Sequence, residues 1–386
     1  MNQHSSPDYG PLKSVPGKLR IDWYRSSVDY ETLQVLNSRS NWKGAWQAIG
    51  HLALFSATGA LCYVLFKQQI WFGFILALFF HGTIGCFFGG IAVHELGHGT
   101  VFKTRWLNGA FMRVYSLLSW WNFHDYALSH TYHHRYTLHP EGDREVVLPR
   151  DPSLNMTYLL QLFTFNLFGG PHSGGFIPTL KGMVKTAFGH VGNTQNSGSD
   201  SGDWFKDLYT THPTARGRAV NWARLVLLFH FGVLAFAITY QLWVLPLVLT
   251  LFSFIANWLK YFVSATMHTG LRSNVSDFRK CARTITLDPV TEFLYWRMNW
   301  HLEHHMYAAV PCYNLKKLHR AIAGDMPKPR TLVSAWHEMR ETKRRQKVDP
   351  TYEFDTPVPS AGRNSGAVLD ATLVASLGDL APRELA

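Results

Sequence analysis

Cysteine and charge are both scarce in this chain. The four cysteines include no Cys-x-x-Cys pair and show no disulfide-framework spacing, so we predict no disulfide bonds. Charged side chains make up 16% of the residues and hydrophobic ones 47%, a balance that is apolar for a soluble enzyme. Both scarcities argue against a disulfide-stabilised protein and against an ordinary soluble one.

Two further signals are missing, a secretory signal peptide and a nucleic-acid-binding module. Residues 1–45 are polar and of mixed charge, unlike the apolar centre of a signal peptide. The formal net charge is +11, but no recognisable module accompanies it, and we expect no nucleic-acid partner. In a chain with long apolar stretches, an excess of Lys and Arg is better explained by membrane orientation and by anionic lipid headgroups.

Long apolar stretches are what the chain has instead, and they come in two pairs. The first pair covers residues 46–66 and 70–93, and the second covers 219–240 and 242–263. Each stretch has the length of about 20 residues that crosses the roughly 30 Å of hydrocarbon in a bilayer. We therefore predict an all-α membrane protein with four transmembrane helices in two hairpins and a helical cytosolic cap.

These spans suggest a division of the chain into three parts. Residues 1–45 would form a cytosolic N-terminal segment, with a helix at the membrane surface over 21–43. Residues 46–325 would form the membrane domain. The tail, 326–386, includes a stretch rich in Pro, Ser and Gly, and we expect it to be largely disordered.

The distribution of basic residues predicts the orientation in the membrane. Of the 37 Lys and Arg residues, Lys67 is the only one in a turn between paired spans. Because cytoplasmic segments carry the excess of Lys and Arg, both termini and the three histidine clusters described next should face the cytosol.

Histidine is clustered in three motifs. HELGH at 94–98 has the i, i+4 spacing, and SHTYHHR at 129–135 and HLEHH at 301–305 each have the spacing i, i+3, i+4. Residues so spaced lie on one face of a helix, so each motif directs its imidazoles to one point. The eight histidines are His94, His98, His130, His133, His134, His301, His304 and His305.

Eight imidazoles exceed what one metal ion needs. Imidazole binds Fe, Zn, Cu and Ni, and tetrahedral zinc takes four ligands in a structural site, or three and a water in a catalytic one. HELGH alone matches the HExxH motif of zinc proteases, with Glu95 as the base. A membrane zinc protease and a non-enzymatic zinc-binding scaffold are therefore alternatives, but both leave several histidines unused. The count favours two metal ions.

The three motifs, in this order around two hairpins, resemble the integral-membrane fatty acid desaturase family, which also includes hydroxylases and ketolases. The likeness covers roughly residues 40–325. It implies a non-haem centre of two iron ions that uses dioxygen to remove hydrogen from an unactivated C–H bond of a lipid or acyl substrate. No HPGG motif of a fused cytochrome b5 domain occurs, so the resemblance implies a separate electron carrier, cytochrome b5 or a ferredoxin. It also implies the endoplasmic reticulum membrane in a eukaryote or the inner membrane in a bacterium.

The resemblance implies a ninth metal ligand and indicates which desaturase subfamilies the chain is most like. Family members often have another histidine before the third motif, and His268 is the candidate here. Acyl-CoA desaturases have an asparagine four residues before that histidine, where this chain has Ser264. The three residues between His94 and His98 are typical of acyl-lipid desaturases, whereas front-end desaturases carry glutamine at the position of His301.

Residues near the motifs are candidates for orienting the ligands or lining a substrate groove. Carboxylates that could accept imidazole N–H groups are Glu95, Asp125, Asp143 and Glu303. His124 and His139 flank the second motif, and the aromatic runs at 120–123 and 295–296 could line an apolar groove. Ordinary structural roles are expected for the isolated histidines His4, His51, His81, His230, His319 and His337.

The expected function is desaturation of an acyl chain or lipid-like substrate with dioxygen. The alternative is hydroxylation, or another oxidation by the same centre, of a specialised lipophilic metabolite. Both reactions share the first hydrogen abstraction and diverge by small differences in substrate placement, which the sequence does not reveal.

Overall fold

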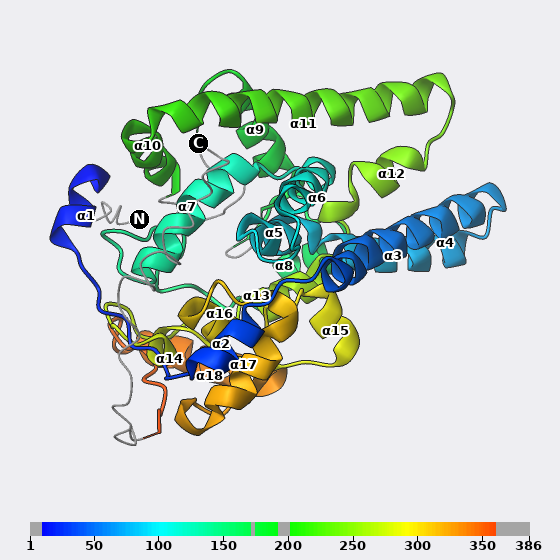
Figure 1. Cartoon of the computed structure of the whole chain (residues 1–386). Coiled ribbons are helices and arrows are strands. Elements are labelled where there is room, and N and C mark those ends of the chain that lie inside the picture. Colours follow the sequence, from blue (N-terminus) through cyan, green and yellow to red (C-terminus); the bar gives the residue numbers. More distant parts are fainter. Residues whose placement is uncertain (1–9, 171–173, 192–200, 360–386) are drawn as a thin grey trace.

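Helices account for most of the chain in the computed structural model, which describes residues 10–170, 174–191 and 201–359 (Figure 1). About 62% of the protein is helical. Among the described residues the only sheet is a parallel pair of two-residue strands, β1 Ile285–Thr286 and β2 Arg330–Thr331. The predicted all-α class is confirmed.

The first predicted hairpin is present as two antiparallel helices, α3 Asn41–Lys67 and α4 Trp71–Gly85. The Ser40 hydroxyl caps α3 by accepting the N–H of Lys43, so this helix begins before the expected residue 46. The third predicted span is α11 Pro213–Thr239. Length and composition suit Asn41–Lys67, Trp71–Gly97 and Pro213–Thr239 for crossing a membrane.

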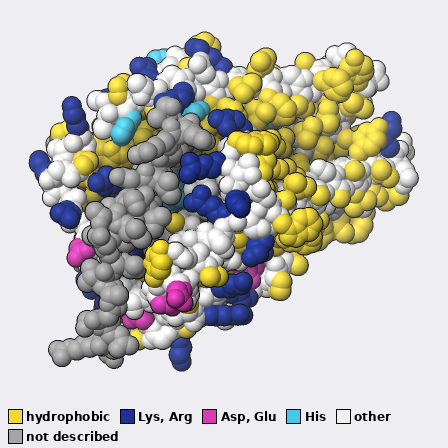
Figure 2. Space-filling view, viewed as in Figure 1, with side chains coloured by type: hydrophobic (Ala, Val, Ile, Leu, Met, Phe, Trp, Pro, Cys, Tyr) yellow, Lys and Arg dark blue, Asp and Glu magenta, His cyan; other side chains and the backbone are white. Residues whose placement is uncertain are grey.

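The apolar ends of these helices project together from the rest of the molecule. In Figure 1 the turn between α3 and α4 and the end of α11 lie on the same side, and Figure 2 shows hydrophobic side chains gathered there. Phe72 on α4 and Leu228 on α11, for example, are 82% and 71% exposed, as expected of side chains that face lipid. Basic side chains gather over the opposite part in Figure 2.

The second span is broken before it reaches the first histidine motif. After α4, a short segment, η2 Phe88–Ala92, contains two glycines with non-helical backbone angles, and α5 Val93–Gly97 follows. Gly90 has φ of +79°, which glycine adopts without a steric penalty. A side chain at Gly89 would lie 2.8 Å from the Trp121 ring. The break therefore requires both glycines.

The predicted fourth span, 242–263, is not a continuous helix. The chain forms α12 Leu245–Leu249, a 3-10 turn η3 Phe252–Phe254, and α13 Trp258–Ser264. Its interrupted backbone bonds elsewhere: Phe254 O accepts from Asn166 N, and Ala256 N donates to Thr164 O. Irregular backbone at membrane depth is tolerated where protein covers it. The predicted single helix over 242–263 is therefore replaced by a broken segment.

The remaining helices form the cap, much of it around the histidines. Their bounds are η1 Leu12–Ser14, α1 Val15–Lys18, α2 Tyr30–Leu36, α6 Arg105–Leu118, α7 Phe123–Tyr136, α8 Met156–Phe163, α9 Phe176–Ala187, α10 Ser201–Thr211, α14 Phe278–Cys281, α15 Pro289–Leu294, α16 His301–Met306, η4 Cys312–Asn314, α17 Leu315–Ile322, η5 Ala323–Asp325 and α18 Leu332–Gln346. All four cysteines are buried and free.

The N-terminal segment differs from the helix predicted over 21–43. Only α2 and the start of α3 are helical in that range, and the residues before α2 run across the cap instead. Trp23 stacks on Phe278 at 4.0 Å between ring centroids, and Arg25 Nε donates to Met306 O. These contacts with residues far along the chain outweigh the local preference for helix.

The expectation of a disordered tail from residue 326 is wrong for 326–359. Helix α18 packs Trp336 against Phe262, and its Glu338 forms an ion pair at 2.6 Å with Arg283. Arg283 is 1% exposed, and a charge so buried needs such a partner. The rest of the predicted tail, 360–386, lies outside the described residues.

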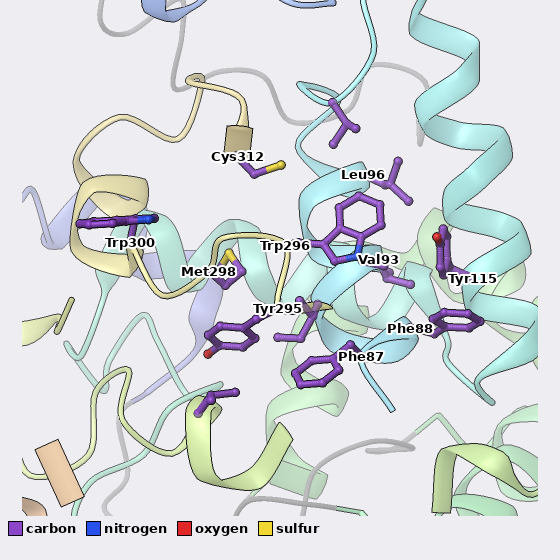
Figure 3. Close-up of a cluster of buried hydrophobic side chains, with 14 of the residues drawn as sticks. Phe87, Phe88, Val93, Leu96, Tyr115, Tyr295, Trp296, Met298, Trp300 and Cys312 are labelled. Atoms are coloured by element: carbon purple, nitrogen blue, oxygen red, sulfur yellow. The ribbon is translucent and has the colours of Figure 1, made fainter. Parts of the chain in front are cut away.

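The core lies between the cap and the start of the membrane helices. Figure 3 shows Phe87 and Phe88 beside Tyr295, Trp296 and Tyr115. Trp296 Nε1 donates to His51 Nδ1, whose ring also lies 3.0 Å, at Nε2, from Ile84 O. The buried indole and imidazole thus satisfy each other. His51 has the structural role expected of it.

Candidate metal centre

Each histidine motif lies on a helix, as its spacing predicts. HELGH begins on α5 directly after the glycine break, the second motif lies in the last turns of α7, and the third forms α16. Asn122 caps the start of α7 through its side chain, which accepts the N–H groups of His124 and Asp125. The fold thus brings the third motif, which follows the second by more than 160 residues, into the same region as the other two.

The nine predicted histidines form two groups of imidazoles. In each group, one ligand atom per residue lies within 4.8 Å of those of all the others. The first group consists of His94, His98, His130, His134 and His304. The second group consists of His133, His268, His301 and His305.

The groups share motifs and lie side by side. The second motif gives His130 and His134 to the first group and His133 to the second. The rings of His134 and His305, one from each group, stack at 4.5 Å. His268 belongs to the second group, with its Nε2 2.8 Å from that of His301. The spacing of the motifs did not reveal which histidine joins which group.

The facing nitrogens have the separations expected of ligands to a common ion. Nε2 of His94 lies 3.3 Å from that of His98, and Nε2 of His304 lies 3.2 Å from that of His134. A metal–imidazole bond of about 2.1 Å puts two ligand nitrogens at right angles about 3.0 Å apart. His130 Nε2, moreover, is buried with no hydrogen-bond partner among the described residues. The residues therefore fit two first-row metal ions.

Burial keeps most of these imidazoles neutral, as metal ligands must be. Burial and the neighbouring histidines hold the pKa values of His130, His134, His304 and His305 well below 6.5. Burial lowers the pKa of His268 to about 3. A neutral ring offers a lone pair, whereas a protonated one has none.

The comparison with known families agrees with this geometry. A family model described as fatty acid desaturase matches residues 68–336, which is well over half of the chain. The chain belongs to the fatty acid desaturase family. The search among curated proteins found no match.

Carboxylates behind the histidines orient two rings in this family member as predicted. His94 Nδ1 lies 3.1 Å from Glu95 Oε1, and His133 Nδ1 lies 2.9 Å from Asp143 Oδ2. Asp143 is fully buried and also accepts the N–H groups of Leu138 and Glu145. Burial has the largest single effect on the pKa of His133 and lowers it, but the charge and hydrogen bond of Asp143, together with the charge of Glu145, raise that pKa above its usual value. Such contacts hold the other nitrogen of each ring toward the metal site.

A third carboxylate, Glu145, was missed from the sequence. Its Oε1 lies 2.9 Å from His130 Nδ1, and its Oε2 accepts the hydroxyl of Ser129. Burial raises the pKa of Glu145 to about 7. It lies 15 residues after its partner and outside any motif, so no spacing identified it.

Other candidates lie elsewhere than predicted. Glu303 contacts His319 Nδ1 at 2.6 Å and accepts from the Thr284 hydroxyl, so it supports α16 from behind. His319, expected to be an isolated structural histidine, is thus its partner. Asp125 accepts the Tyr209 hydroxyl.

The two histidines beside the second motif belong to neither group. Burial lowers the pKa of His124 to about 4, and its ring lies against Phe123. His139 Nδ1 lies 3.1 Å from Thr137 O, and its ring contacts Trp23 edge to face. Both have packing roles in the described structure.

A cavity of about 190 Å³ opens beside both groups. Histidines of the first group (His94, His130) and of the second (His133, His268, His301) line it, as does Ser264. Of the predicted groove aromatics, Trp120 and Trp121 also line it. Tyr295 and Trp296 are fully buried in the core and do not.

Proposed function

We propose that this chain is a membrane-bound di-iron oxidoreductase that desaturates an acyl chain or lipid-like substrate, using dioxygen and electrons from a separate carrier. One observation carries the proposal: two adjacent groups of imidazoles, most of them buried, open onto a single cavity. Family membership supports iron over zinc. The first group of five histidines would hold one ion, and the second group of four would hold the other.

When bound, a di-iron centre supplies the activation of dioxygen that removes hydrogen from an unactivated C–H bond. The chain itself positions the histidine ligands and buries the site. Glu95, Glu145 and Asp143 hold the Nδ1 atoms of His94, His130 and His133. These rings are then fixed with Nε2 toward the ions before substrate arrives, which removes a reorganisation cost from the reaction.

The position of Glu95 argues against the zinc protease. A protease base must reach the metal-bound water, but Glu95 lies beside Nδ1 of His94, whereas Nε2 of that ring faces His98. Glu95 is not among the residues that line the cavity. Hydroxylation of a specialised lipophilic metabolite stays the second candidate, because the cavity has several polar lining residues.

The experiment is turnover of lipids by purified protein with measured iron. The protein would be placed in vesicles with cytochrome b5 or a ferredoxin, the matching reductase and NADH or NADPH, with and without dioxygen. We expect about two iron ions per chain and a dioxygen-dependent product that is two hydrogens lighter. A product one oxygen heavier would favour hydroxylation, and one zinc per chain without any lipid oxidation would contradict the proposal.

The proposed orientation puts the site and both termini in the cytosol, where cytochrome b5 or a ferredoxin could deliver electrons. The sequons at Asn155 and Asn274 would then stay unmodified after expression in a eukaryotic membrane. Both lie in the cap, and Asn155 is on the surface at the start of α8. A glycosidase-sensitive mass shift at either asparagine would contradict this orientation.

A further inference from the structure

The cavity beside the histidines has a basic side chain in its wall. Lys260, on α13, lines the same cavity as His94 and His130. Its Nζ donates to Gly89 O at 2.6 Å, at the break in the second span, and lies 5.2 Å from the centre of the Trp121 ring. An ammonium in an apolar surrounding is costly unless it is paired.

Lys260 has no acidic partner among the described residues, where no Asp or Glu oxygen lies within 4.0 Å of its Nζ. Two other buried cations do have such partners: Arg279 pairs with Asp277 and Asp325, and Arg283 pairs with Glu338. Arg150, which also lines the cavity, donates to the backbone oxygen of Glu145. An ammonium has three N–H donors, and Gly89 O uses one. Among the described residues, no ion pair within 4.0 Å balances the charge of Lys260, although Glu145 lines the same cavity.

Three neutral polar groups in the cavity wall also lack partners in the described structure. They are Trp121 Nε1, Ser253 Oγ and Asn257 Oδ1, each buried without a hydrogen bond to protein. Leaving a buried donor or acceptor unpaired costs about 1–3 kcal/mol. A hydrocarbon chain would leave all of them, and Lys260, unpaired. The oxygen atoms of a bound ligand would accept hydrogen bonds from Lys260, the Trp121 N–H and the Ser253 hydroxyl. Asn257 Oδ1 is itself an acceptor and would need a donor instead.

We propose that Lys260 binds the carboxylate of a lipophilic substrate, so that the substrate is a free acid rather than an ester or thioester. This inference rests on the proposed function, since it takes the cavity as the substrate site. The Trp121 N–H and the Ser253 hydroxyl are neutral donors that could also bond to the carboxylate. The Trp121 ring and Phe254 give the same cavity an apolar wall.

The plain alternative is that Lys260 only caps the carbonyl left free by the break at Gly89. That role needs one N–H and no charge, and a neutral side-chain amide would serve it. It also does not account for Trp121 Nε1 and Ser253 Oγ in the same wall. The two explanations make different predictions for binding, because only an anion site distinguishes a carboxylate from its methyl ester.

Anchoring at Lys260 would also determine which carbons are oxidised. The anchor and the histidines line one cavity, so the carbon presented to the metal site would be counted from the acid end of the substrate. Substrate acids of different length would then react at the same distance from their carboxylate.

The test is equilibrium binding, which needs no turnover. Radiolabelled dodecanoic acid would bind the protein in phosphatidylcholine nanodiscs at pH 8, with empty nanodiscs as the background, and would be displaced by unlabelled acid, methyl dodecanoate or dodecanol. We expect the acid to compete at least about 10-fold better than the ester or the alcohol, the scale of a charge-assisted hydrogen bond. Equal competition by acid and ester in the unmodified protein would overturn the proposal, whatever any variant does.

Variants then assign the effect to Lys260. Lys260→Met should abolish the preference for the acid, and Lys260→Arg should keep most of it. Lys67→Met, which removes the exposed lysine at the end of α3, is the matched control and should leave binding unchanged. A preference for the acid that survives in Lys260→Met would also overturn the proposal. Failure of the proposed function would appear separately, as absence of iron or of dioxygen-dependent lipid oxidation in the unmodified protein.

Discussion

The two histidine groups draw on the same helices but differ in what holds their rings. In the first group, His94 and His130 hydrogen-bond to carboxylates, and His304 Nδ1 lies 3.7 Å from Glu95 Oε1. Two further members, His98 and His134, are partly exposed. In the second group all four are buried. There His133 contacts Asp143, His268 Nδ1 lies 2.7 Å from Cys281 O, and His305 Nδ1 lies 3.2 Å from the Thr137 hydroxyl.

This difference suggests how each group responds to the substitution of a single histidine. The first group has five imidazoles, so a single loss leaves four, enough to retain an ion but not in the arrangement that turnover needs. The second has four, each deeply buried and most of them held by the surrounding chain, so every loss opens a coordination position. The two sites should therefore fail in different ways when single residues are changed.

The largest effect is expected from replacing a ligand that faces the cavity. His94→Ala in the first group and His301→Ala in the second should each reduce lipid oxidation to background, because each removes a nitrogen from a metal position. Product formation by purified, folded protein is the measurement. His337→Ala, which changes an exposed histidine on α18, is the control. Near-normal activity in both cavity variants would refute the two-group site.

A second variant separates the groups by metal content. His268→Ala leaves three imidazoles in the second group and all five in the first. We expect iron to fall from about two to about one per chain and activity to fall by at least roughly 100-fold, the upper end for outer contacts. Metal analysis by mass spectrometry measures the first effect. Two retained ions would show that His268 is not a ligand.

Changes behind the rings should be milder and should also differ between groups. Glu95→Gln and Asp143→Asn keep a hydrogen-bond acceptor but remove the charge, so each should lower turnover about 10–100-fold with iron retained. Asp143→Asn should be the more severe, because Asp143 also holds three backbone N–H groups. Glu341→Gln, on the surface of α18, is the control.

The same Glu95 variant tests the protease alternative. Cleavage of a membrane peptide that continues without dioxygen and disappears in Glu95→Gln would favour a zinc protease, with Glu95 as its base. In the di-iron interpretation, the variant keeps measurable lipid oxidation.

The smallest effect is expected from weakening the contact that supports α16, the helix that carries ligands of both groups. Glu303→Gln weakens the contact with His319, and we expect the free energy of unfolding to fall by about 1–3 kcal/mol, the cost of a poorly paired buried group. Thermal unfolding measures this effect, and iron content should not change. Loss of iron in this variant would show that Glu303 positions ligands directly.

The features that the sequence predicted are local along the chain, whereas those it missed depend on contacts between distant segments. The histidine motifs are local, so helical spacing alone placed the rings of each motif on one face. Glu145 and His319 lie 15 and 16 residues from their partners along the chain, on segments whose position depends on the whole fold. The predicted fourth span is interrupted for a related reason, since its backbone bonds to residues 164 and 166, and apolar composition alone does not reveal such a break.

The glycine break in the second span has a mechanical consequence. A continuous helix transmits tilt along its whole length, whereas the non-helical angles at Gly89 and Gly90 interrupt it one turn before His94. The membrane segment and the short helix that carries HELGH are therefore joined by a bend rather than by a continuous rod. A change in the tilt of the hairpin would not be carried as a rigid-body rotation into the helix that holds the first imidazoles.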